Sequence, residues 1–234
     1  MKKLVCFSII YLSLISYTKK VDGPFVNPVI AVDTIHKSYL ALGDSYTIGE
    51  SVADTEAFPV QTVKFLRKHG ISISNPDVIA RTGWTTADLL NALNNHPPKK
   101  TFSVVSLLIG VNNQYRGESL DEYIIEFTKL MNMAVYYAGN IRSHVFILSI
   151  PDYSVTPFAR GPAAATIAGD IDNFNAANRI ISLNADVHYL DITSVSRNAK
   201  DDPALTAIDG LHPSAIQYKK WSELLAPVML LEFH

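Results

Sequence analysis

Three residues have the types and the chain order of a nucleophile, a carboxylate and a base. Ser45 follows a short apolar run and precedes a turn, which is the placement of a nucleophile at the end of a strand. Asp209 and His212 are three residues apart, so the carboxylate can hold one imidazole nitrogen while the other takes the serine proton. The alternatives are that Asp44 or Ser45 caps a helix and that Asp209 belongs to a plain turn.

Two further positions offer groups that stabilise a negatively charged oxygen. Gly83 lies after a second apolar run, where a glycine lets the backbone approach a ligand and direct its N–H at it. Asn112 follows a third run, and its side-chain amide is a neutral donor suited to an oxyanion. Taken alone, either residue also fits an ordinary strand-to-helix turn. The five residues together indicate acyl transfer through a serine.

Alternating strand-like and helical runs predict the elements that position these residues. Strand-like apolar runs occur at residues 38–43, 77–81, 103–109, 144–150 and 187–192. Helical patterns occur at residues 58–69, 85–95, 119–138, 166–184 and 215–231. This alternation predicts parallel strands joined by right-handed crossovers, and hence an α/β protein folded as a three-layer α/β/α sandwich. In such a sheet the functional residues follow the carboxyl ends of the strands.

The composition excludes several classes of protein. The chain has 234 residues, of which 48% are hydrophobic and 18% charged, so one domain with a sizeable core is expected. A formal charge of −2 gives no electrostatic basis for binding nucleic acid or an anionic membrane. The single cysteine, Cys6, excludes a disulfide framework within the chain and a cysteine-based zinc or iron–sulfur site. No metal or organic cofactor is expected.

The first twenty residues read as a secretory signal. Two lysines follow Met1, and fourteen uncharged residues (4–17) then precede a second lysine pair. Fourteen residues make about 21 Å of helix, short of the ~30 Å hydrocarbon core, and a core helix is the alternative. We expect residues 1–20 to be a signal peptide, 21–36 a linker and 37–234 the folded domain of a secreted or periplasmic protein without a membrane span. Tyr17 stands where a lipoprotein signal has cysteine, so lipid anchoring is not expected.

From about Tyr39 to the C-terminus, the sequence resembles the GDSL, or SGNH, hydrolase family. Four blocks match in order: Gly43-Asp44-Ser45, then Gly83, then Gly110-Val111-Asn112, then Asp209 to His212. The resemblance implies a flavodoxin-like sheet of five parallel strands and serine ester hydrolysis. One departure is Asn113, where the family usually has Asp; this position is outside the triad, so the difference concerns the local loop.

The resemblance also implies a role for each matched residue. Ser45 would be the nucleophile, His212 the general base and then the acid, and Asp209 the residue that orients His212. The N–H groups of Ser45 and Gly83 and the side-chain amide of Asn112 would hold the oxyanion.

The substrate is predicted only as a class, a small-molecule ester with a short acyl group such as a carbohydrate or lipid ester. Apolar residues next to the motif positions are candidates for a substrate-binding wall: Tyr46, Trp84, Tyr115, Tyr153 and Phe158. Ordinary packing is the alternative for each of them. Two other functions stay open. One is a flavodoxin-like nucleotide or flavin binder, although the loop after Gly43 has neither glycine-rich phosphate motif. The other is a non-catalytic carbohydrate-binding relative.

Overall fold

The computed structural model describes residues 36–234. The predicted signal peptide and nearly all of the predicted linker therefore lie outside the described residues. Among the helices of residues 36–234, none has both the length and the hydropathy that a bilayer span requires.

Five parallel strands form a single sheet in the order β2-β1-β3-β4-β5. The strands are β1 (Tyr39–Asp44), β2 (Asp77–Arg81), β3 (Val104–Leu108), β4 (Val145–Leu148) and β5 (His188–Leu190). The chain runs from β1 to β2 on one side and then crosses to β3 on the other. This reversal at β1 and β3 is the switch point at which flavodoxin-like sheets place their functional site.

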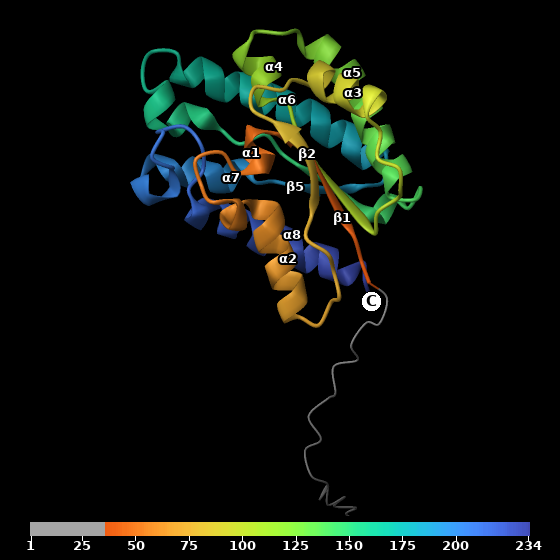
Figure 1. The fold of residues 1–234 in the computed structure, drawn as a ribbon. Helices are drawn as coiled ribbons and strands as arrows, with labels where there is room; N and C mark the ends of the chain where they lie inside the picture. The colour runs from red at the N-terminus through yellow and green to blue at the C-terminus, as the bar shows by residue number, and fades with distance from the viewer. Residues whose placement is uncertain (1–35) are drawn as a thin grey trace, which may run out of the picture. The chain divides into compact units, whose positions relative to one another are not determined.

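Helices cover both faces of the sheet, which confirms the predicted three-layer α/β/α sandwich (Figure 1). On one face α2 (Phe58–Lys68) packs against α8 (Ala215–Leu231). On the other face α5 (Leu120–Tyr137) packs between α3 (Thr86–Asn95) and α6 (Ala164–Asn184). Short helices occupy the connections: α1 (Ser45–Ile48), α4 (Val111–Tyr115) and α7 (Thr193–Ser196). The 3-10 turns are η1 (Asp54–Glu56), η2 (Arg142–His144), η3 (Tyr153–Val155), η4 (Pro157–Ala159), η5 (Arg197–Lys200) and η6 (Pro203–Leu205).

The predicted elements lie within two residues of the observed ones at each end. Side-chain caps explain two sharp helix starts: Thr85 accepts from the N–H of Asp88, and Ser119 accepts from the N–H of Glu122. The sequence analysis missed α4 and α7, because helices of four or five residues are too short to show a 3.6-residue period.

Close packing at the end of β1 fixes the start of α1. Both β1 and β3 are buried along their whole length, as the continuous apolar runs predicted. A Cβ on Gly43 would lie 2.1 Å from Thr47 Oγ1 and 2.3 Å from the carbonyl oxygen of Leu108. Only glycine therefore lets α1 fold back against the strand ends, and this turn places Ser45 at the carboxyl edge of the sheet.

Candidate active site

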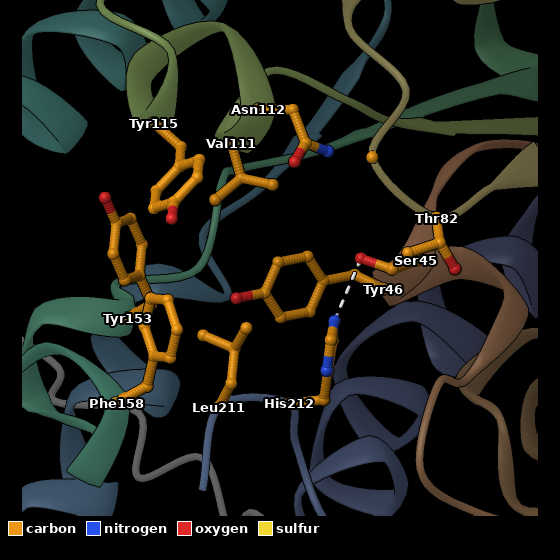
Figure 2. Close-up of a pocket in the computed structure, with 11 residues that line it drawn as sticks. Ser45, Tyr46, Thr82, Val111, Asn112, Tyr115, Tyr153, Phe158, Leu211 and His212 are labelled. Carbon is orange, nitrogen blue, oxygen red and sulfur yellow. Dashed lines mark hydrogen bonds between the residues drawn. The ribbon is translucent and has the colours of Figure 1, made fainter. Parts of the chain in front are cut away.

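The carboxyl ends of three neighbouring strands bring the candidate residues to one cavity (Figure 2). Ser45 follows β1, Gly83 follows β2 and Asn112 follows β3, while His212 enters from the loop before α8. The cavity has a volume of about 220 Å³. Its lining consists of Ser45, Tyr46, Thr82, Gly83, Val111, Asn112, Tyr115, Tyr153, Phe158, Leu211 and His212.

A chain of hydrogen bonds joins the serine, the imidazole and the carboxylate. Ser45 Oγ donates to His212 Nε2 at 3.0 Å, and His212 Nδ1 donates to Asp209 Oδ2 at 2.6 Å. Both Ser45 and His212 are buried, and the ring of Tyr46 packs against the imidazole with centroids 5.3 Å apart. This arrangement leaves His212 Nε2 as the acceptor for the serine proton, which is the requirement for activating a hydroxyl nucleophile.

Asp209 is held as an anion by donors on both oxygens. Its Oδ1 accepts from the N–H groups of Leu211 at 2.9 Å and His212 at 3.0 Å. Its Oδ2 accepts from the His212 ring and from Ser51 Oγ. Partial burial acts to raise the pKa of Asp209, but these hydrogen bonds outweigh it and hold the pKa at about 2. Asp209 therefore stays ionised at any pH at which the protein would act.

Three groups at the cavity are the candidates for holding a developing oxyanion. Ser45 is the first residue of α1, so its N–H has no acceptor within the helix. Gly83 has φ of 80°, a left-handed conformation that glycine adopts without strain. Asn112 Nδ2 donates one hydrogen to the carbonyl oxygen of Trp84 at 2.9 Å, which aims the amide and leaves its second hydrogen for a ligand.

Arg116, the residue after α4, also holds the loop that carries Gly83. Arg116 Nη2 donates to the carbonyl oxygen of Gly83 at 2.5 Å, and its Nη1 lies 3.7 Å from Asp88 Oδ2. The sequence analysis had no signal for this contact, because Arg116 and Gly83 are 33 residues apart and neither spacing nor charge pairs them. The guanidinium thus fixes the peptide that follows the candidate oxyanion donor.

Asn113 anchors the start of α3 beside this loop. Its Oδ1 accepts from the N–H of Thr86 at 3.1 Å, while its Nδ2 donates to Thr86 Oγ1 at 2.6 Å and to Glu118 Oε2 at 2.7 Å. Thr86 Oγ1 in turn donates to Glu126. An amide suits this position because it donates to one partner and accepts from another between two carboxylates. Where the family usually has Asp, this chain thus has an amide that donates to Glu118.

Aromatic side chains form the wall opposite the serine. Tyr115, Tyr153 and Phe158 contact one another with ring centroids 6.1–6.4 Å apart. Tyr153 Oη donates to Gln114 Oε1 at 2.8 Å, so its polar end has a partner and its ring faces the cavity. Tyr46 lines the cavity from the α1 side. Phe158, which follows β4 on the turn η4, lines the cavity as well.

Trp84 is the exception among the predicted substrate-binding residues. Its half-buried side chain packs against the hydrophobic core, and its backbone carbonyl accepts the bond from Asn112. The prediction placed it at the cavity because it follows Gly83, but after this left-handed turn the next side chain packs on the core instead. Thr82 and Leu211, which the sequence analysis did not single out, line the cavity instead.

A buried carboxyl lies beside the nucleophile. Asp44 is 1% exposed and caps α1 by accepting from the N–H of Tyr46 at 3.0 Å. Burial raises the pKa of Asp44 to about 7. Within residues 36–234, no group of three or more His, Cys, Asp or Glu side chains is arranged to hold a metal ion.

The sequence profile of the GDSL-like lipase/acylhydrolase family matches residues 41–220, which include the whole site. The chain belongs to this family. As a GDSL-family member it is a carboxylic ester hydrolase. No curated protein sequence matches the chain.

Solved structures share the GDSL-family fold at low sequence identity. TesA superimposes with a TM-score of 0.65 at 16% identity, covering 84% of this chain and 99% of TesA. Axe2, an acetylxylan esterase from Geobacillus stearothermophilus, has a TM-score of 0.59 at 20% identity, covering 84% and 94%. A GDSL-like lipase from Bacteroides thetaiotaomicron has a TM-score of 0.60 at 15% identity, covering 82% and 87%.

Proposed function

We propose that the protein is a serine esterase that acts through an acyl-enzyme on small esters with short acyl groups. The observation that carries this proposal is the hydrogen-bond chain from Ser45 through His212 to Asp209, which opens onto an apolar cavity. Ser45 already has its proton acceptor in place, so the first step of the reaction requires only an ester carbonyl bound in the cavity.

The first half-reaction forms the acyl-enzyme. Ser45 Oγ attacks the ester carbonyl carbon while its proton passes to His212 Nε2, and the imidazolium is stabilised by the Asp209 carboxylate. The carbonyl oxygen becomes an oxyanion and accepts hydrogen bonds from the Ser45 N–H, the Gly83 N–H and the Asn112 amide. His212 then gives its proton to the leaving alcohol as the carbon–oxygen bond breaks.

The second half-reaction releases the acid. A water molecule attacks the acyl carbon, His212 Nε2 takes its proton, and a second oxyanion forms at the same donors. Collapse of this intermediate breaks the bond to Ser45 Oγ, which recovers the proton from His212. The products are the carboxylic acid and the free enzyme.

The cavity wall favours an uncharged, compact acyl group. None of the residues that line the cavity is Asp, Glu, Lys or Arg. Tyr153, with Val111 and Leu211, bounds the space opposite the serine. Tyr115 and Phe158 are 60% and 51% exposed, so they border the mouth, where the end of a longer acyl chain would lie.

Replacement of the nucleophile tests the proposal. With p-nitrophenyl acetate we expect Ser45→Ala to lower kcat by about 10⁴-fold or more, because the hydroxyl that is hydrogen-bonded to His212 is lost. Ser194→Ala, which removes an exposed serine hydroxyl outside the cavity, should keep activity within about twofold. Near wild-type activity in Ser45→Ala would refute the proposal.

An ester series tests the acyl preference separately. We expect p-nitrophenyl acetate and butyrate to be hydrolysed with higher kcat/KM than the octanoate, because the aromatic wall limits the length of an extended chain. A highest kcat/KM for octanoate would contradict the preference for short acyl groups while leaving the serine mechanism intact.

A further inference from the structure

A hydroxyl on the loop after α1 completes the hydrogen bonding of Asp209. Ser51 Oγ donates to Asp209 Oδ2 at 2.7 Å, and the same oxygen accepts from His212 Nδ1 at 2.6 Å. The other oxygen accepts from backbone N–H groups of Leu211 and His212. Among the described residues, Ser51 is therefore the donor that holds Asp209 from outside the segment 209–212.

The backbone at Ser51 is in a conformation that favours glycine. Its φ is 67°, and the other non-glycine residues of the described chain with positive φ are Asn140 and Asp186. Asparagine and aspartate tolerate this region better than serine does. A serine here therefore costs conformational energy that glycine would avoid, and strained residues of this kind gather at functional sites. The side chain, rather than the backbone, explains why a serine stands at this turn.

The segment 49–51 contacts the parts of the chain that carry Ser45, Gly83 and Asp209. The N–H groups of Gly49 and Glu50 both donate to the carbonyl oxygen of Ser45. The Glu50 carboxylate accepts from Thr82 Oγ1, next to Gly83. Ser51 then reaches Asp209. Segments that are far apart in the sequence are thus joined by two adjacent side chains of one loop.

We propose that Ser51 is a positioning residue for the Asp209–His212 pair, a role that rests on the proposed esterase function. Its hydroxyl holds Asp209 Oδ2 in line with His212 Nδ1, so that the imidazole keeps its Nδ1–H tautomer and turns Nε2 to Ser45. It also donates to the carboxylate oxygen that accepts from His212, and this second donor weakens the bond from His212 Nδ1. Ser51 does not contact the reacting atoms and acts through Asp209.

The decisive variant is Ser51→Gly, because glycine suits the backbone conformation and removes the side chain that donates to Asp209. We expect kcat for p-nitrophenyl acetate to fall by about tenfold while KM stays within about twofold, since orientation of the base is lost and substrate binding is not. Thermal unfolding should occur at the same or a higher Tm than in the wild type. In the ¹H NMR spectrum of the free enzyme, the His212 Nδ1 proton should shift downfield, because the carboxylate loses a competing donor.

Two further variants control for effects on the backbone. Ser51→Ala also removes the hydroxyl but keeps a Cβ, so it should lose the same kcat and show a lower Tm than Ser51→Gly. Asn140→Gly makes an equivalent glycine substitution at an exposed turn with φ of 63°, on the loop after α5. It should leave kcat and the Nδ1 proton unchanged.

The outcomes separate this inference from the proposed function. A Ser51→Gly enzyme with kcat within about twofold of wild type and an unshifted Nδ1 proton would overturn the role of Ser51. Wild-type protein without esterase activity would refute the proposed function instead. The NMR measurement needs no substrate, so it decides whether Ser51 acts on the Asp209–His212 pair in either case.

Discussion

The two sides of the cavity are built from different interactions. On one side, Ser45, His212 and Asp209 are joined by directional hydrogen bonds, and nearly every polar atom has an identified partner. On the other, Tyr115 and Phe158 meet through ring contacts and are more than half exposed. Hydrogen bonds fix positions closely, whereas ring contacts are less directional. We infer that the polar side sets the reaction and the aromatic side adjusts which esters are accepted.

Among variants that leave Ser45, His212 and Asp209 in place, the largest expected effect comes from Asn112, on the polar side. Asn112→Ala removes a donor to the oxyanion, and we expect kcat to fall by about 10²–10³-fold with KM changed by less than about threefold. Steady-state kinetics with p-nitrophenyl acetate measure this. A loss of less than about tenfold would mean that the amide serves only its bond to the Trp84 carbonyl.

The next effect concerns the amide that stands where the family usually has a carboxylate. Asn113→Asp would place a third carboxylate beside Glu118 and Glu126, and we expect it to lower the free energy of unfolding by about 1–3 kcal/mol. Urea unfolding measures the loss.

Glu118→Gln supplies the matched background for that substitution. The amide that it introduces can donate to the new carboxylate, so Asn113→Asp should cost much less in the Glu118→Gln protein than in the wild type. Additive losses in the double mutant would show that the two side chains are not coupled.

A smaller effect tests Asp44, the buried carboxyl next to the nucleophile in the sequence. Because burial raises the pKa of Asp44 to about 7, the unfolded chain releases this proton at lower pH than the folded protein does. The folded state then binds more protons between about pH 4 and 7, so this carboxyl makes stability fall as pH rises through that range.

Asp44→Asn removes this pH dependence while keeping an oxygen to cap α1. We expect the variant to gain about 1–2 kcal/mol of stability relative to wild type at pH 8 and to show little difference near pH 4. Chemical unfolding at both pH values measures the gain. The same difference at pH 4 and pH 8 would show that Asp44 does not change its protonation in this way.

The smallest expected effect lies on the aromatic side. Phe158→Ala should lower kcat/KM for p-nitrophenyl butyrate by about three- to tenfold and change the acetate value by less than about threefold, because the longer chain reaches further along the wall. Tyr136→Ala, at an exposed tyrosine on α5 outside the cavity lining, is the control and should change neither value. Equal losses for both esters would contradict the assignment of this wall to acyl selection.

The contrast between the polar side and the aromatic side of the cavity also explains which residues could be predicted from the sequence. Short motifs at the ends of predicted elements predict the polar residues, because each of these must follow a strand or precede a helix to reach the cavity. These residues are Ser45, Gly83, Asn112, Asp209 and His212. Apolar patterns and helix caps predict the first and last residues of the longer helices and of the strands to within two residues. The resemblance to the GDSL family and the three-layer fold are both confirmed.

The supporting contacts could not be predicted in this way. Ser51, Arg116 and Glu118 reach their partners through loop geometry, and nothing in their types or spacing distinguishes them from solvated surface residues. The aromatic wall was predicted only by proximity to the motifs. Trp84 lies against the core and not in the cavity lining, because the direction of a side chain after a left-handed glycine depends on the folded turn.

The most direct test of the account is covalent labelling with a fluorophosphonate probe, which requires the nucleophile, the base and the oxyanion donors together. Mass spectrometry of the labelled wild-type protein should show one adduct, mapped to Ser45, and His212→Asn should label far more slowly. No adduct, or an adduct on a different residue, would contradict the assignment of Ser45 as the nucleophile of this site.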